Sequence, residues 1–103
     1  MSISKIKNSF ISNNLLSRGF TELSDIQNKI LDIYQNKKDL LVTSQTGSGK
    51  TIAYFLSIQD EISLKKVKEK SSPSVLIIAP TRELAIQVYE EALWVFKSEN
   101  INV

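Results

Sequence analysis

One glycine-rich segment stands out in the sequence, Ser44-Gln45-Thr46-Gly47-Ser48-Gly49-Lys50-Thr51. Gly47 and Gly49 allow the backbone to bend tightly and to bring successive N–H groups onto phosphate oxygens. Lys50 can then reach the β- and γ-phosphates, and the hydroxyl of Thr51 can ligate Mg²⁺. The segment therefore predicts a phosphate-binding loop (P-loop) for a nucleoside triphosphate with magnesium.

The segments around this loop predict alternating strands and helices. Residues 40–43 and 75–79 are short, continuous apolar runs, which suit strands buried in a parallel sheet, and Pro80 stops the second run. Residues 51–64 and 81–98 have helical periodicity, and residues 101–103 look like the start of a third strand. Strand, helix, strand, helix, strand predicts an α/β fold in which helices flank a parallel sheet.

Two further helices are expected before the loop. Apolar residues at loosely helical spacing predict one helix over residues 3–16, with Gly19 as its C-terminal stop. A second helix is expected from Ser24 to about Lys37, with Ser24 and Gln27 as a capping box. The lysine-rich residues 65–74 are expected to form a solvated helix end and loop.

Composition excludes several kinds of chemistry. The chain has 103 residues, no cysteine and no histidine, so disulfides, thiolate metal sites and imidazole catalysis are ruled out. Its formal net charge of +2 is too small to indicate nucleic-acid binding without a motif. The N-terminal residues resemble neither a signal peptide nor a membrane span, so a cytoplasmic location is expected.

Two flanking stretches each allow two interpretations. Gln27 could cap its helix, or its carboxamide could pair with the N6 amino group and N7 of adenine. The stretch Pro80-Thr81-Arg82-Glu83-Leu84-Ala85 could be an ordinary N-capped helix start. It also follows the second apolar run at the sheet edge where ligands bind in such folds, and its groups suit nucleic-acid phosphates.

Taken together, three ordered stretches resemble the DEAD-box family of ATP-dependent RNA helicases. Residues 19–27 resemble its Q motif, Ser44 to Thr51 its motif I, and Pro80 to Ala85 its motif Ia. The family usually has Pro where this sequence has Leu23, and Ala where it has Ser44. The resemblance implies a partial RecA-like P-loop fold, and it identifies residues 1–103 as the N-terminal part of a helicase ATP-binding domain.

The resemblance also implies roles for individual residues. RNA would be bound through its backbone, with little sequence preference. ATP with Mg²⁺ would be the cofactor, and Thr51 would ligate the metal. The residues expected to bind ATP are Phe10, Phe20, Gln27, Thr46, Gly47, Ser48, Gly49, Lys50 and Thr51, and those expected to touch RNA are Pro80, Thr81, Arg82 and Glu83.

Catalysis is not expected from these residues alone. The chain ends before the family's Asp-Glu-Ala-Asp motif and before its second RecA-like domain, which supply the carboxylates and arginines of phosphoryl transfer. We therefore expect the 103 residues to fold marginally and to be inactive as a hydrolase. Two alternatives stay open at this point: a P-loop ATPase or kinase of another class, and a non-catalytic module that binds nucleotide or RNA.

Overall fold

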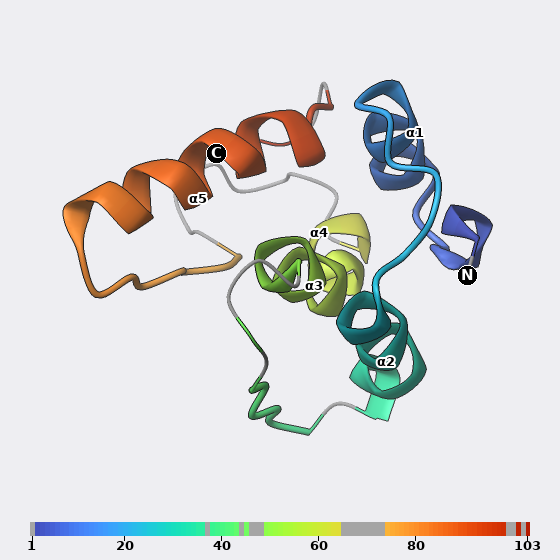
Figure 1. Ribbon diagram of the computed structural model, residues 1–103, viewed down its shortest axis with the longest axis horizontal. Helices are drawn as coiled ribbons and strands as arrows, with labels where there is room; N and C mark the ends of the chain where they lie inside the picture. Colours follow the sequence, from blue (N-terminus) through green and yellow to red (C-terminus); the bar gives the residue numbers. More distant parts are fainter. Residues whose placement is uncertain are drawn as a thin grey trace.

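The computed structural model describes residues 2–36, 38–43, 45, 49–64, 74–98, 101 and 103. The described chain is helical (Figure 1). Its elements are η1 (Ile3–Lys5), α1 (Ser9–Ser17), α2 (Asp25–Ile33), η2 (Tyr34–Asn36), α3 (Lys50–Ser57), α4 (Gln59–Leu64) and α5 (Arg82–Val95).

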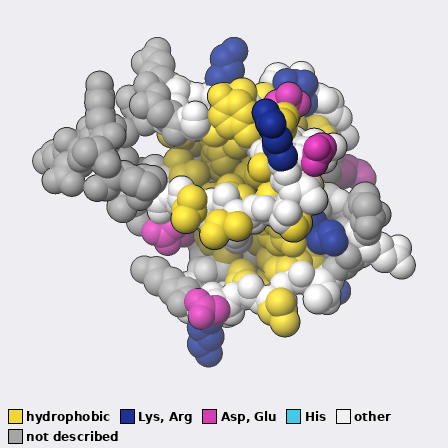
Figure 2. Space-filling model, turned by 90° about the vertical axis from the view of Figure 1, so that its left-hand side faces the viewer, with side chains coloured by type: hydrophobic (Ala, Val, Ile, Leu, Met, Phe, Trp, Pro, Cys, Tyr) yellow, Lys and Arg dark blue, Asp and Glu magenta, His cyan; other side chains and the backbone are white. Residues whose placement is uncertain are grey.

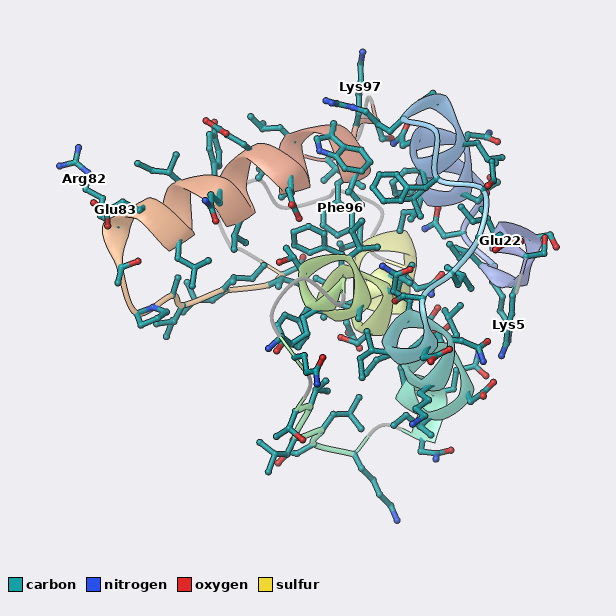
Figure 3. The ribbon with its side chains drawn as sticks, in the orientation of Figure 1. Lys5, Glu22, Arg82, Glu83, Phe96 and Lys97 are labelled. Atoms are coloured by element: carbon teal, nitrogen blue, oxygen red, sulfur yellow. The ribbon has the colours of Figure 1, made fainter. Side chains whose placement is uncertain are left out.

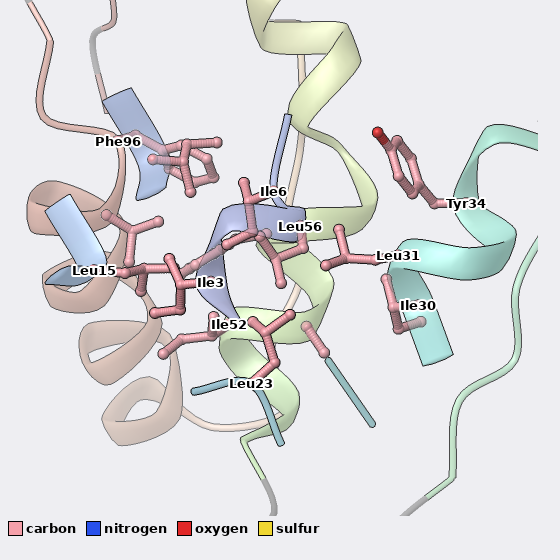
Figure 4. Close-up of a cluster of buried hydrophobic side chains, with 14 of the residues drawn as sticks. Ile3, Ile6, Leu15, Leu23, Ile30, Leu31, Tyr34, Ile52, Leu56 and Phe96 are labelled. Carbon is pink, nitrogen blue, oxygen red and sulfur yellow. The ribbon is translucent and has the colours of Figure 1, made fainter. Parts of the chain in front are cut away.

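Helix α3 lies at the centre of the molecule. It contacts α2 on one side and α5 on the other, and α1 packs against the C-terminal half of α5 (Figure 1). Apolar side chains from all these elements form one buried cluster (Figure 4). Its largest fully buried apolar side chains are Phe55, Ile11, Leu15, Ile30, Leu56 and Val95. Phe55 meets Phe96 edge to face, with ring centroids 4.9 Å apart. Helix α3 is thus the element against which α2, α4 and α5 pack.

The N-terminal segment is not one continuous helix, so the prediction for residues 3–16 was wrong. A short 3-10 turn ends at Lys5, and α1 begins at Ser9 after Asn8, whose side chain accepts a hydrogen bond from the Ile11 N–H at 3.4 Å. Asn is a strong N-cap, and the apolar spacing alone did not reveal the new start. The predicted stop at Gly19 is confirmed, because Gly19 has φ 86° and follows α1 in a Schellman-type ending.

The other helices occur where the sequence predicted them, with shorter limits. The capping box of Ser24 and Gln27 is present, and α2 gives way to η2, which ends at Asn36. The predicted helix 51–64 breaks at Ile58 into α3 and α4. Buried Gln59 stabilises this break: its side chain donates to the Leu56 carbonyl at 3.0 Å and accepts from the Asn8 N–H at 3.3 Å.

The predicted parallel sheet is not formed in the described part of the chain. Residues 40–43 and 75–79 form no strand, and neither Ile101 nor Val103 does; the isolated bridge between Ser2 and Glu22 is antiparallel. Parallel strands need both faces covered, and two or three short strands alone are marginal. Here Leu41 is 94% exposed and Ile78 84% exposed, and Val42 is partly buried against the core, so these runs are covered only in part. The predicted loop at 65–74 lies outside the described residues except for Ser74.

The two halves of α5 have different surroundings. Ala92 and Val95, with Phe96 just beyond the helix, are buried, whereas Leu84 and Ala85 near its start are exposed. Figure 1 shows the reason, since the first turns of α5 extend away from the other helices. Figure 2 shows hydrophobic side chains gathered on the face at this end of the molecule. No helix of the described residues is both long and apolar enough to cross a membrane.

Candidate nucleotide and nucleic-acid site

The start of α3 has the backbone geometry that a P-loop needs. Gly49 is its N-cap in the left-handed region, with φ 88° and ψ 26°, and no side chain caps the helix. The first N–H groups of a helix carry the positive end of its dipole, which favours an anion there. Lys50 and Thr51 follow in the first turn and are partly exposed. The other predicted phosphate ligands of the loop, Thr46, Gly47 and Ser48, lie outside the described residues, as does Ser44.

The structure brings Gln27 against this helix start. The carboxamide nitrogen of Gln27 donates to the Gly49 carbonyl at 3.3 Å. Its carboxamide oxygen accepts from the Ser24 N–H at 2.9 Å, and the Gln27 N–H donates to the Ser24 hydroxyl oxygen at 3.4 Å. The capping interpretation of Gln27 is therefore confirmed, and the same side chain also connects α2 to the P-loop.

Gly49 leaves no room for a side chain on the face that meets Gln27. A Cβ atom at this position would lie 2.6 Å from the carboxamide nitrogen of Gln27 and 3.2 Å from the hydroxyl oxygen of Ser24. Such contacts are closer than packed atoms tolerate, and the positive φ already disfavours an L-residue. The backbone conformation thus favours glycine at 49, and a side chain there would also have to displace the end of the Gln27 side chain.

The two predicted adenine-side aromatics lie in different surroundings. Phe10, in the first turn of α1, is partly buried against the hydrophobic core. Phe20 stacks on Trp94 of α5 instead, with ring centroids 5.8 Å apart and ring planes 15° apart. Neither ring is placed against Gln27 by a ring contact or hydrogen bond of the described residues.

The predicted RNA-contacting residues lie at the far N-terminal end of α5. The hydroxyl oxygen of Thr81 accepts from the Leu84 N–H at 3.2 Å, so Thr81 is the N-cap of this helix. Pro80, Arg82 and Glu83 are exposed beside it. Figure 3 shows Arg82 directed away from the rest of the molecule. The guanidinium is thus accessible to a phosphate group.

Sequence reasoning missed one polar cluster, between the turn after α1 and the last turns of α5. There the Arg18 guanidinium carbon lies 4.8 Å from the centre of the Trp94 ring. Burial raises the pKa of the neighbouring Glu91 carboxyl above its ordinary value. Gln87, Glu91 and Trp94 recur every three or four residues, which places them on one helix face. That spacing was the available signal, but the sequence does not show that Arg18 lies opposite.

The other described residue with a shifted pKa is Tyr34, in η2. Burial is the main reason that the pKa of Tyr34 is raised above 10.0, and its hydroxyl accepts a hydrogen bond from the Gln35 carboxamide at 3.3 Å. The described residues contain no group of three or more acidic, histidine or cysteine side chains able to hold a metal ion. Among the predicted site residues that are described, Thr51 is the candidate ligand for Mg²⁺.

Comparison with known proteins decides the family. The sequence profile of the DEAD/DEAH box helicases matches residues 24–103. The chain belongs to the DEAD/DEAH box helicase family. It is 41% identical over 87 residues to the probable ATP-dependent RNA helicase DDX4 of Bos taurus, covering 80% of this chain. It is also 37% identical over 93 residues to the ATP-dependent RNA helicase DBP4 of Meyerozyma guilliermondii, covering 86% of this chain.

The matches cover most of this chain but little of the relatives. In both proteins they span 12% of the relative's length. No solved structure matches the chain. Membership of the family implies a RecA-like fold and the use of ATP, and it makes a P-loop kinase or an ATPase of another class the less favoured interpretation.

Proposed function

We propose that these 103 residues form the ATP- and RNA-binding front segment of a DEAD-box RNA helicase, corresponding to the N-terminal part of its first RecA-like domain. The observation that carries the proposal is the contact between Gln27 and Gly49, which joins the Q motif to the P-loop. Unwinding of RNA duplexes with ATP is proposed for the longer protein of which such a segment is a part. The segment by itself is proposed to bind and not to hydrolyse.

In this proposal the start of α3 holds the nucleotide phosphates. The N–H groups that follow Gly49 and the Lys50 ammonium bind the β- and γ-phosphates, and the Thr51 hydroxyl ligates Mg²⁺. Glycine at 49 allows the left-handed backbone and leaves the Gln27 carboxamide in place, which supports the fit. Thr46, Gly47 and Ser48 complete the loop by sequence. Bound Mg²⁺ supplies charge neutralisation on the phosphate oxygens.

Gln27 has the hydrogen-bonding capacity to read adenine while it keeps its structural bonds. A carboxamide offers two N–H donors and two acceptor lone pairs. One donor is used on the Gly49 carbonyl and one lone pair on the Ser24 N–H, so one of each is left for N7 and the N6 amino group. Gln27 is 5% exposed, so the atoms that cover its side chain must move before adenine can reach it. Phe10 and Phe20 are proposed to flank the base after that rearrangement.

The second proposed site is the exposed end of α5. Pro80, Thr81, Arg82 and Glu83 would contact an RNA strand through its backbone, with Arg82 as the charged group that pairs with phosphate. The unpaired runs 40–43 and 75–79 are proposed to become neighbours in the parallel sheet of a RecA-like domain in a longer chain. The Gly49 and Arg82 regions would then both follow strand ends at one sheet edge.

The test separates the adenine role of Gln27 from its capping role. In Gln27→Glu the side chain still accepts from the Ser24 N–H, so the capping box survives, but the amide donor is lost. We expect magnesium-ATP to bind the wild-type chain more tightly than magnesium-GTP by calorimetry. Gln27→Glu should lose this preference and keep the capping box, and its melting temperature should fall because a buried carboxylate oxygen then faces the Gly49 carbonyl. Gln27→Ala should lose both the preference for adenine and the capping box, and its melting temperature should be lower than that of the wild type.

Lys50→Ala is the control for triphosphate binding, and it should weaken ATP and GTP equally. If Gln27→Glu kept the full preference for adenine, the role given to Gln27 would be wrong. Steady-state ATP hydrolysis by residues 1–103, stimulated by RNA and lost in Lys50→Ala, would contradict the proposal that the segment only binds.

A further inference from the structure

A pocket of about 520 Å³ lies between the turn after α1 and the C-terminal half of α5. It is lined by Arg18 from the turn and by Gln87, Glu90, Glu91 and Trp94 from the helix. Glu90 and Glu91 each lie three or four positions from both Gln87 and Trp94, so the four residues share one side of α5. None of these five residues belongs to the proposed nucleotide or RNA site.

One wall of the pocket already binds a guanidinium group. Arg18 lies over the Trp94 ring at 4.8 Å, a cation–π distance, and Phe20 stacks on the same indole. The stacking of Phe20 holds the indole in place, so the aromatic wall is pre-formed. The surface of this wall suits a flat cation.

Glu91, on the same face of α5 as Trp94, has an unsatisfied carboxylate oxygen. One side-chain oxygen of Glu91 is buried and accepts no hydrogen bond. Arg18 forms no ion pair with Glu90 or Glu91; the ion pair formed within the described part of the chain joins Lys5 to Asp32. A buried acceptor without a donor is costly, and nearly all such atoms in native proteins find a partner. The pocket therefore lacks a hydrogen-bond donor beside Glu91.

We propose that this pocket binds an arginine side chain from a partner protein. A guanidinium is planar, carries five N–H donors in a fixed fork, and can stack on Trp94 while it donates to Glu91. A lysine ammonium can supply charge but not the flat stacking surface. RNA fits poorly, because its phosphates would be repelled by the carboxylates of Glu90 and Glu91.

The chain offers a direct reporter for this binding. Trp94 is the single tryptophan, so its fluorescence and its indole N–H resonance report on the pocket alone. The probe is the capped pentapeptide Gly-Gly-Arg-Gly-Gly, titrated into the full chain. The same peptide with citrulline in place of arginine keeps the shape and removes the charge, and a lysine peptide keeps the charge and removes the flat fork.

We expect a saturable change with the arginine peptide, a weaker one with lysine and none with citrulline. Glu91→Gln should weaken arginine binding about tenfold or more, the factor typical of losing a hydrogen bond to a charged group. Arg18→Gln should strengthen it, because a competing cation leaves the pocket. Glu91→Asp, which keeps the charge, should retain part of the affinity if the fold is unchanged by circular dichroism.

Three results would overturn the inference. Equal binding of the citrulline and arginine peptides would show that charge recognition is absent. An unchanged affinity in Glu91→Gln would remove the carboxylate from the site. A larger response to a single-stranded RNA oligonucleotide than to the arginine peptide, lost in Trp94→Ala, would assign the pocket to nucleic acid instead.

Discussion

At the scale of single residues, Gly49 carries two constraints that can be measured separately. Gly49 and Gly19 have nearly the same positive φ, 88° and 86°. A Cβ at Gly19 would meet no atom within 4 Å, whereas one at Gly49 would collide with Gln27. The two glycines thus form a matched pair in which backbone strain is common and steric contact differs.

We expect Gly19→Ala to lower the free energy of unfolding by about 1–2 kcal/mol, the cost of a left-handed L-residue. Gly49→Ala should cost about 1–3 kcal/mol more, the range for forced contacts in a packed site. Urea unfolding, monitored by circular dichroism, measures the free energy of unfolding of both variants. In a double-mutant cycle, Gln27→Ala should recover part of the extra cost. An equal loss of unfolding free energy in the two glycine variants would show that Gln27 and α2 move away from the added methyl group at no cost.

Glu91 gives a second prediction at this scale, on pH dependence. Burial raises its pKa in the folded state above the ordinary 4.5, so the folded protein holds this proton more tightly than the unfolded chain. Stability is therefore lost as the pH rises from the ordinary pKa through the raised one, and the loss is complete above it. Glu91→Gln cannot ionise, so it should raise the melting temperature slightly at neutral pH and leave it unchanged at pH 3.

Glu90→Gln is the matched control, since it makes the same change of net charge at an exposed neighbouring position. An identical pH profile of melting temperature in the two variants would mean that net charge, and not the burial of Glu91, causes the effect. The prediction also has a functional side. A carboxylate that costs stability in the free protein is available to a cationic ligand.

At the scale of elements, α5 divides into a free and a packed half. Its N-cap is Thr81, and the turns that follow expose Leu84 and Ile86. Its last turn is held by the core and by the Asn14 carboxamide, which donates to the carbonyls of Val95 and Lys97 at 2.9 and 3.0 Å. Losing the cap should therefore release only the free half.

Thr81→Ala should speed amide hydrogen exchange in the first turn of α5, because N-caps contribute about 1 kcal/mol. The midpoint of urea unfolding should change little, since these turns touch little of the core. Ser24→Ala removes the equivalent cap from α2, which packs on α3, and should lower global stability by about 1 kcal/mol. Thr81→Ser is expected to keep the slow exchange. A global loss in Thr81→Ala as large as in Ser24→Ala would contradict this division of α5.

Local signals predicted correctly where helices occur, although two of the predicted helices are divided. The strands that they predicted do not form within the described residues. Ser24 with Gln27, and Gly19, act within a few residues, so their caps and stops could be read from the sequence and are present in the structure. Residues 40–43 and 75–79 have strand composition, but a strand depends on partners from elsewhere in the chain, and these runs are covered only in part. The pairing of Gln27 with Gly49 and of Arg18 with Trp94 joins distant segments, which one sequence does not reveal.

At the scale of the whole molecule, the exposed apolar runs are the main departure from an ordinary globular surface. Leu41, Leu76 and Ile78 are each more than three-quarters exposed. Both runs consist largely of consecutive apolar residues that form no strand, which is the pattern of an aggregation-prone segment. The buried core is built from the helices, and α2 and α5 both pack on α3. Folding of the core and exposure of the runs are therefore separable properties.

We predict that the 103-residue chain self-associates through these runs, and that the double variant Leu41→Lys/Ile78→Lys is monomeric. Sedimentation velocity over a concentration series measures the association, and thermal unfolding at low concentration checks the fold. Because neither side chain contacts the core, the lysines should leave the melting temperature nearly unchanged while they add repulsion along the edges. Leu16→Lys, a half-exposed change on α1, is the control and should not reduce association. A wild-type chain that stayed monomeric at high concentration would show that the runs are satisfied within the molecule.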